Sequence, residues 1–177
     1  MQSFSDLANK RESCRSYINK PVEREKLEYI INTARLSPSA CNSQPWHFTA
    51  VTGTTARTAA KFLQYMGINK FTEKCPAFII INEEKVKIIS GPDGIPDDQH
   101  YAQIDIGIAA AHICYAALDA GLSTCIIGMF SEEELKNLLS ISPEKRIRLV
   151  IAVGYASDKP LHIKSRKELQ ETATFIE

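Results

Sequence analysis

Two short basic clusters near opposite ends of the chain carry the side chains that a phosphate group needs. The first runs from Arg11 to Arg15 with Ser13 between the two arginines, and the second contains Lys164 and Arg166. An arginine can hold a phosphate through two parallel hydrogen bonds, and a lysine adds a point charge. Either cluster alone is more typical of a solvated surface, where most charged side chains lie. The two clusters together indicate a site for a phosphorylated ligand.

The segment 37–46, SPSACNSQPW, lies between the two clusters and combines small residues with amide side chains. The small residues at positions 38–40 allow a ligand to approach the backbone closely, and Asn42 and Gln44 offer both donors and acceptors. A flavin ring has a mixed donor and acceptor edge of that kind. The segment alone is equally consistent with a turn between a helix and a strand. Together with the two basic clusters, it points to flavin mononucleotide (FMN).

The composition is that of an ordinary globular protein with a single domain. The chain has 177 residues, of which 44% are apolar and 24% are charged, and this length is sufficient for a substantial core. The net charge is zero, which argues against nucleic acid as the main partner because phosphate backbones are bound through a basic surplus. A small local basic site is compatible with that balance.

The expected location of the protein is the cytoplasm. The first ten residues contain no apolar run of the secretory kind. The longest apolar stretch, 104–120, is interrupted by Asp105, His112 and Asp119 and is too short for a membrane span. The five cysteines form no C-x-x-C pair and the four histidines have no ligand spacing, so we expect reduced thiols and no metal site.

Hydrophobic periodicity predicts helices that alternate with strands, which is typical of a layered α/β or α+β domain. Helices are predicted over 23–36 and 101–120, and the second is apolar nearly all round, which suits the centre of the fold or a contact with a second subunit. Turn-forming residues predict a loop over 91–98. Strands are predicted over 46–51, 77–81, 123–127 and 147–153.

Three capping signals refine the helix boundaries. Gly121 suits the C-terminal cap of the long apolar helix. Thr54 or Thr55 is expected to cap a helix in the middle of the chain, and Ser131 with Glu134 matches a capping box.

The last residues, 157–177, form a polar tail that carries Phe175 and Ile176 near its end. Such a tail stays disordered unless it docks on something, and a partner subunit is the natural candidate. We therefore expect one domain over 1–177 whose tail docks on the partner subunit.

The motifs, taken in their order along the chain, resemble those of the FMN-dependent nitroreductase family nearly from end to end. The stretch from Pro38 to Trp46 is the specific element of this resemblance. The other matching positions are Arg11, Ser13, Arg15, Tyr17, Ala34, Asp105, Gly107, Ala109, His112, Gly121, Leu122, Ile127, Gly128, Val153, Gly154, Tyr155, Pro160, Lys164 and Arg166. The resemblance implies an α+β fold of three layers, α/β/α, with a central mixed, mainly antiparallel sheet flanked by helices, in an intertwined homodimer.

The resemblance also implies that FMN lies at the interface of that homodimer. Arg11, Lys164 and Arg166 would hold its phosphate, and Arg15 would face the N1/C2=O edge of the ring, where reduction leaves negative charge. The implied cofactor-binding residues are Arg11, Ser13, Arg15, Pro38, Ser39, Ala40, Asn42, Gln44, Asn69, Ile127, Gly128, Lys164 and Arg166.

Several of these roles have a defined place on the cofactor in the family pattern. Residues 38–42 would come from the other subunit and line the ring and the ribityl chain. The backbone amides of Ile127 and Gly128 would face N5 and O4, and Asn69 would contribute a polar contact to the pyrimidine. Cys41 lies near this site and is expected, like Cys14, to be a small buried packing residue.

The resemblance implies an enzyme that needs no catalytic side chain and no metal. The flavin would accept hydride at N5 from NADH or NADPH and pass it to a nitroaromatic, a quinone or a similar acceptor, with ping-pong kinetics. Three alternatives stay open: the same fold with other flavin chemistry, such as flavin fragmentation, dehalogenation or enone reduction; a flavin-binding redox sensor without turnover; and an anion-binding module without flavin.

Overall fold

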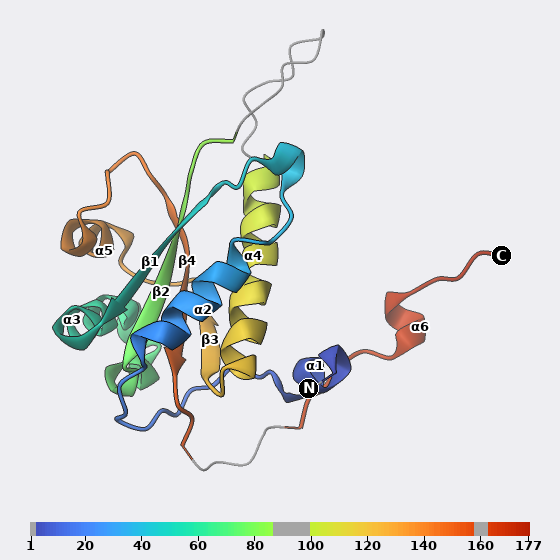
Figure 1. Cartoon of the computed structure of the whole chain (residues 1–177), viewed down its shortest axis with the longest axis horizontal. Helices are drawn as coiled ribbons and strands as arrows, with labels where there is room; N and C mark the ends of the chain where they lie inside the picture. The colour runs from blue at the N-terminus through green and yellow to red at the C-terminus, as the bar shows by residue number, and fades with distance from the viewer. Residues whose placement is uncertain (1–2, 87–99, 158–162) are drawn as a thin grey trace, which may run out of the picture.

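The described residues, 3–86, 100–157 and 163–177 of a computed structural model, form a four-stranded antiparallel sheet between two layers of helices (Figure 1). Helices α2 and α4 cover one face of the sheet, and α3 and α5 cover the other. The strands lie in the order β1-β2-β4-β3. Their bounds are β1 Trp46–Thr52, β2 Ala77–Glu83, β3 Ser123–Ile127 and β4 Ile147–Gly154. The helices are α1 Phe4–Lys10, α2 Arg24–Ala34, α3 Gly53–Leu63, α4 His100–Asp119, α5 Glu132–Leu139 and α6 Leu169–Thr172.

The second strand, β2, is the centre of the core. All of its residues are buried, and successive side chains alternate between the two helical layers. Ile79 and Ile81 face α2 and α4, whereas Phe78 and Ile80 face α3 and α5. A strand covered on both faces has no polar side, so the continuous apolar run at 77–81 correctly predicted this environment.

The long helix α4 is apolar on most of its surface because it lies against both α2 and the sheet. It is long and apolar enough to cross a membrane by length and composition, yet half of that stretch is buried within the chain. Gly121 ends it with φ +76°, and the N–H of Leu122 donates to the carbonyl of Ala117 at 2.8 Å. This bond is typical of the Schellman cap, so the predicted role of Gly121 is confirmed.

Two other capping predictions are wrong. Thr52 stands at the N-cap of α3, ahead of Thr54 and Thr55, and its side chain makes no capping bond. Ser131 does precede α5, but its side chain also caps nothing. The N–H of Ser131, which would donate to Glu134 in a capping box, instead donates to the carbonyl of Phe62 at 2.9 Å, so a contact with α3 replaces the local box.

The segment before α2 extends the sheet beyond β3. Ser13 pairs with Thr124 in the parallel direction, and Tyr17 pairs with Ala156 in the antiparallel direction. The sheet is therefore mixed but mainly antiparallel, and the predicted α+β fold class is confirmed. The predicted loop at 91–98 lies outside the described residues. The chain from 163 onward leads away from the body of the molecule, and α6 lies within it (Figure 1).

Candidate functional site

The cations from both ends of the chain meet at the C-terminal end of α1. Lys164 Nζ donates to the carbonyl of Ala8 at 2.8 Å and also to the carbonyl of Asn9. Removal from water, followed by the nearby charges of Arg11 and Arg166, holds the pKa of Lys164 below its ordinary value. Like charges repel one another at such distances, so an anion between them would relieve the repulsion.

A cavity of about 200 Å³ lies beside Arg11, between the end of α4 and the start of β3. Its lining residues are Lys10, Arg11, Glu12, Cys114, Leu118, Leu122, Ser123 and Thr124. Of the three cations, Arg11 lines this cavity, so open space adjoins its side chain.

The chain from Arg11 to Arg15 runs parallel to β3. Ser13 pairs with Thr124, and the N–H of Cys14 donates to the carbonyl of Thr124 at 2.8 Å. Because the segment runs parallel to β3, Arg15 lies two residues beyond the Ser13–Thr124 pair, farther along the strand. The cations Arg11 and Arg15 are therefore spread along the strand, with Arg15 toward its C-terminal end.

Asn69 lies near the C-terminal end of the same strand. Its backbone is left-handed, with φ +56°, and its Nδ2 donates to the carbonyls of Leu63 and Met129, both at 3.2 Å. These two bonds fix the orientation of the amide. Gly128 follows the last residue of β3 in the ladder, so its N–H takes no part in strand pairing. Asn69 is therefore bonded to Met129, the residue that directly follows Gly128.

The structure thus brings eight of the predicted site residues to one edge of the molecule, which we call the β3 half-site. They are Arg11, Ser13, Arg15, Asn69, Ile127, Gly128, Lys164 and Arg166.

The other predicted residues form a strained loop, which we call the loop half-site: Pro38, Ser39, Ala40, Asn42 and Gln44. The 3-10 turn η1, Ala40–Asn42, lies within it, and Asn42 and Gln44 both have left-handed backbones, with φ +51° and +50°. The N–H of Ala40 donates to both carboxylate oxygens of Asp105, at 3.2 and 3.1 Å. Asp105 is buried in α4, so it fixes the position of the loop.

The loop half-site lies near the start of α4, whereas Arg11 and the start of β3 lie at its other end (Figure 1). The loop half-site is attached to Asp105 in the second turn of the helix, whereas Leu118 lines the cavity beside Arg11. Thirteen residues of helix span about 20 Å at 1.5 Å per residue. Within one chain, the loop half-site therefore does not reach Arg11 at the start of β3.

Sequence reasoning missed two features of this region. Asp105 was matched as a motif position without a role, although a carboxylate in an apolar helix signals a buried hydrogen-bond partner. The exposed apolar side chains of Tyr65, Met66, Ile68 and Met129 were not noticed at all. Gly67, a turn-forming residue between Met66 and Ile68, was the sequence signal for an exposed turn at this place.

The cysteines near the half-sites differ in their environments. Cys14 is buried, and this burial raises the pKa of its thiol, as expected for a packing residue. Cys41 is exposed, so the prediction that it is buried is wrong. The strained loop turns its side chain outward, because the loop is held to the body of the molecule through the N–H of Ala40 rather than through Cys41.

Comparisons with known proteins agree with this architecture. The model of the Nitroreductase family matches residues 8–155. An oxygen-insensitive NADPH nitroreductase of Helicobacter acinonychis is 27% identical over 202 residues, which cover 96% of this chain and 95% of that protein. An iodotyrosine deiodinase of Danio rerio is 23% identical over 201 residues, which cover 99% of this chain and 68% of that protein.

A solved structure extends the likeness to the fold. A protein from Exiguobacterium sibiricum, crystallised in complex with FMN, superposes with a TM-score of 0.85 over 99% of this chain and 98% of that one, at 18% identity. The sheet order, the two basic clusters beside β3 and the match over residues 8–155 lead to one conclusion: the chain belongs to the nitroreductase family.

Proposed function

We propose that this protein is an FMN-dependent oxidoreductase that transfers hydride from NADH or NADPH to electrophilic acceptors such as nitroaromatics and quinones. The observation that carries the proposal is the linear order of the β3 half-site. Three cations gather at the start of β3, Arg15 lies farther along the strand, and Asn69 and Gly128 lie at its end. That order matches the phosphate, the ring edge and the far ring atoms of one extended FMN molecule.

Each part of the β3 half-site has a chemical role in this proposal. Arg11, Lys164 and Arg166 hold the phosphate, and a dianion between them would relieve the repulsion that lowers the pKa of Lys164. Arg15 places a positive charge at the N1/C2=O edge, where reduction leaves negative charge. Bound FMN supplies the hydride chemistry itself.

The ring atoms that need specific partners find them near the end of β3. The Oδ1 of Asn69 is proposed to accept the ring N3–H, because the bonds from Nδ2 to the carbonyls of Leu63 and Met129 fix the orientation of the amide. The N–H groups of Ile127 and Gly128 are proposed to donate to N5 and O4. Donors aimed at these atoms would stabilise the ring in its reduced form.

The loop half-site is proposed to act in the second subunit of a homodimer. Within a chain, the loop half-site lies toward the opposite end of α4 from Arg11, and we propose that a second copy brings its loop to the β3 half-site. The outer side of α4 supports this arrangement because Tyr101 and Ile104 are exposed there, at 59% and 51% of their surface. The exposed Phe175 and Ile176 of the tail are proposed to dock on the same partner.

The proposed acceptors are flat and aromatic. Tyr65, Met66, Ile68 and Met129 expose apolar surface beside Asn69. Such surface suits a ring that stacks briefly on the flavin and then leaves. Reductive dehalogenation of an aromatic substrate is the second candidate function, and the likeness to an iodotyrosine deiodinase over 99% of this chain favours it.

The experiment that tests the proposal is the visible absorption spectrum of the purified protein, recorded before and after anaerobic addition of NADH or NADPH. Flavin bands that bleach with a nucleotide and return with a nitroaromatic or a quinone are the expected result. Return of the bands with an iodinated phenol, with release of iodide, would select the second candidate. A protein that stays colourless after FMN is added would overturn both.

A further inference from the structure

The C-terminal end of α3 is bonded to the segments that surround Asn69. The last carbonyls of a helix have no partner within the helix, so other groups must satisfy them. In α3 these carbonyls belong to residues 60–63. Two of them accept side-chain bonds, from the hydroxyl of Thr72 at 3.1 Å and from Nδ2 of Asn69 at 3.2 Å. The other two accept the N–H groups of Gln64 at 3.3 Å and of Ser131 at 2.9 Å. The end of α3 therefore joins segments that lie far apart in the chain.

Asn69 is held through both its side chain and its main chain. Its Nδ2 donates to the carbonyls of Leu63 and Met129. Its own carbonyl accepts two bonds from Thr72, one from the N–H at 2.9 Å and one from the hydroxyl at 2.8 Å. The backbone between these contacts is left-handed, with φ +56°, a conformation that asparagine adopts more readily than most residues but that still needs support from its surroundings. The orientation of the amide therefore depends on both sets of bonds.

Thr72 is completely buried in the 3-10 helix η3, Lys70–Lys74. Its hydroxyl has a single hydrogen and two carbonyls within range, that of Asn69 at 2.8 Å and that of Ala60 at 3.1 Å. The hydroxyl also accepts the Nε2 of Gln64 at 3.4 Å. A buried hydroxyl among three polar partners is fixed in place, whichever carbonyl takes the hydrogen. Thr72 therefore links the main chain of Asn69 to the end of α3.

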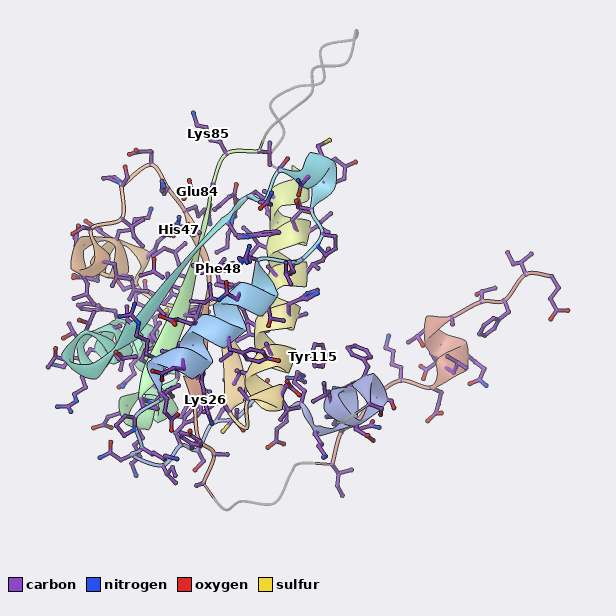
Figure 2. The ribbon with its side chains drawn as sticks, viewed as in Figure 1. Lys26, His47, Phe48, Glu84, Lys85 and Tyr115 are labelled. Carbon is purple, nitrogen blue, oxygen red and sulfur yellow. The ribbon has the colours of Figure 1, made fainter. Side chains whose placement is uncertain are left out.

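The same helix end also holds the backbone that follows β3. The N–H of Ser131 donates to the carbonyl of Phe62 at 2.9 Å, and the carbonyl of Met129 accepts one of the two amide bonds. Gly128, whose N–H is proposed to donate to the flavin, directly precedes Met129. Figure 2 labels Tyr115 on α4, which covers the other face of the sheet. The end of α3 is therefore separate from the surface of α4 that is proposed to meet the second subunit.

We propose that Thr72 is a positioning residue for the flavin, because it holds the carbonyl of Asn69 and so keeps the amide of Asn69 directed at the ring N3–H. The inference rests on the proposed function, which assigns Oδ1 of Asn69 to that ring atom. Thr72 is completely buried, so it acts through Asn69 rather than by contact with the ligand. Without its hydroxyl, the carbonyl of Asn69 keeps only the bond from the N–H of Thr72. The left-handed backbone then relaxes, and the amide moves with it.

The test measures how well each protein distinguishes FMN from 3-methyl-FMN, in which a methyl group replaces the hydrogen on N3. Both flavins are titrated into the apoprotein, and binding is followed by fluorescence. Thr72→Val removes the hydroxyl and nearly keeps the shape of the side chain, whereas Thr72→Ser keeps the hydroxyl. Thr58→Val is the matched control, because it makes the same replacement on α3, where the hydroxyl of Thr58 donates to the carbonyl of Thr54 at 3.2 Å.

Wild-type protein is expected to bind FMN about tenfold more tightly than 3-methyl-FMN, because the methyl group removes the bond to Asn69 and occupies its place. Thr72→Val should reduce this preference to about twofold, whereas Thr72→Ser and Thr58→Val should preserve it. A hydroxyl that only stabilises the fold gives a different result, in which Thr72→Val weakens the binding of both flavins equally. That result, an unchanged preference in Thr72→Val, or a wild-type protein without any preference would overturn the proposal.

A second measurement separates the failure of this inference from the failure of the proposed function. Urea denaturation of the apoprotein compares Thr72→Val, Asn69→Gly and the double variant. Glycine adopts the left-handed backbone without support, so Thr72→Val should cost less stability in the Asn69→Gly background than in wild type. If neither flavin binds but this coupling is present, Thr72 positions Asn69 and the flavin assignment fails. If flavin turnover is present while the coupling and the change in flavin preference are both absent, the inference is refuted and the proposed function remains.

Discussion

The β3 half-site and the loop half-site are held in place by different means. The β3 half-site combines segments from positions 11–15, 69, 127–128 and 164–166, which strand pairing and backbone hydrogen bonds bring to one edge. The loop half-site is continuous in sequence and strained, and it is tied to the body through the carboxylate of Asp105. The β3 half-site therefore depends on long-range topology, whereas the loop half-site depends on its local backbone shape and on one anchor, Asp105.

The largest expected effect comes from combining variants of the two half-sites. Arg11→Glu reverses a phosphate-binding charge, and Ala40→Trp fills the space that a ligand needs, so each variant alone should lose nearly all turnover. Co-expressed with different tags and purified as a mixed dimer, the two chains should recover about half of the wild-type turnover per dimer, because one of two interface sites is then intact.

Two chains that both carry Arg11→Glu, with the same pair of tags, serve as the control and should show no recovery. If the mixed dimer is as inactive as its parents, the two half-sites do not meet across an interface, and the proposed arrangement is wrong.

The next effect concerns the β3 half-site alone. Arg11→Ala removes one charged contact to the phosphate, and the expected loss is about 1.5 to 3 kcal/mol, or about tenfold or more in FMN affinity. Fluorescence titration of the apoprotein with FMN measures it. Replacement of the exposed Arg35, which lies after α2, should leave the affinity unchanged. An Arg11→Ala protein with wild-type affinity removes Arg11 from the phosphate site.

A smaller effect is expected from the anchor of the loop half-site. Asp105→Ala leaves the N–H of Ala40 without its acceptor and should lower the free energy of unfolding by about 1 to 3 kcal/mol. Asp119→Ala is the matched control on the same helix, because Asp119 is exposed and accepts only the hydroxyl of Tyr29 at 2.6 Å. Urea denaturation compares the two variants, and equal losses would show that Asp105 is no special anchor.

The smallest effect is a pH dependence of FMN binding. The pKa of Lys164 lies below its ordinary value of 10.5, because of its removal from water and the nearby Arg11 and Arg166. A bound dianion favours the charged amine, so FMN affinity should be highest while Lys164 is protonated and should fall as the pH rises through its pKa. Lys164→Arg keeps the charge and should flatten this profile in titrations up to pH 10. The same alkaline fall in both proteins would mean that another group titrates.

Much of the fold was predictable because local patterns determine local structure. The apolar run at 77–81 required a strand covered on both faces, and Gly121 required a helix end with positive φ, and both predictions are confirmed. The capping box at Ser131 failed because the N–H of Ser131 donates to the carbonyl of Phe62, a residue of the distant helix α3. At Ser131, a tertiary contact therefore outweighs the local capping signal.

The candidate site was predictable as a set of residue types but not as an arrangement in space. The motifs named the cations of both clusters and the amides of the loop, yet they gave no sign that Asn69 would be oriented by Met129 or that Cys41 would be exposed. Both outcomes depend on turns in which Cys41 and Asn69 have left-handed backbones. The sequence signals for such turns are weak at these two residues.

The sequence by itself determined the helices and strands, the family motifs and the chemistry of the charged and amide side chains. The tertiary structure decided that Lys164 reaches the end of α1 beside Arg11. It also decided that the loop half-site and Arg11 stand toward opposite ends of α4. The physical reason is that periodicity and capping act within a few residues, whereas these positions depend on the pairing of β3 with β4 and on helices packed across the sheet.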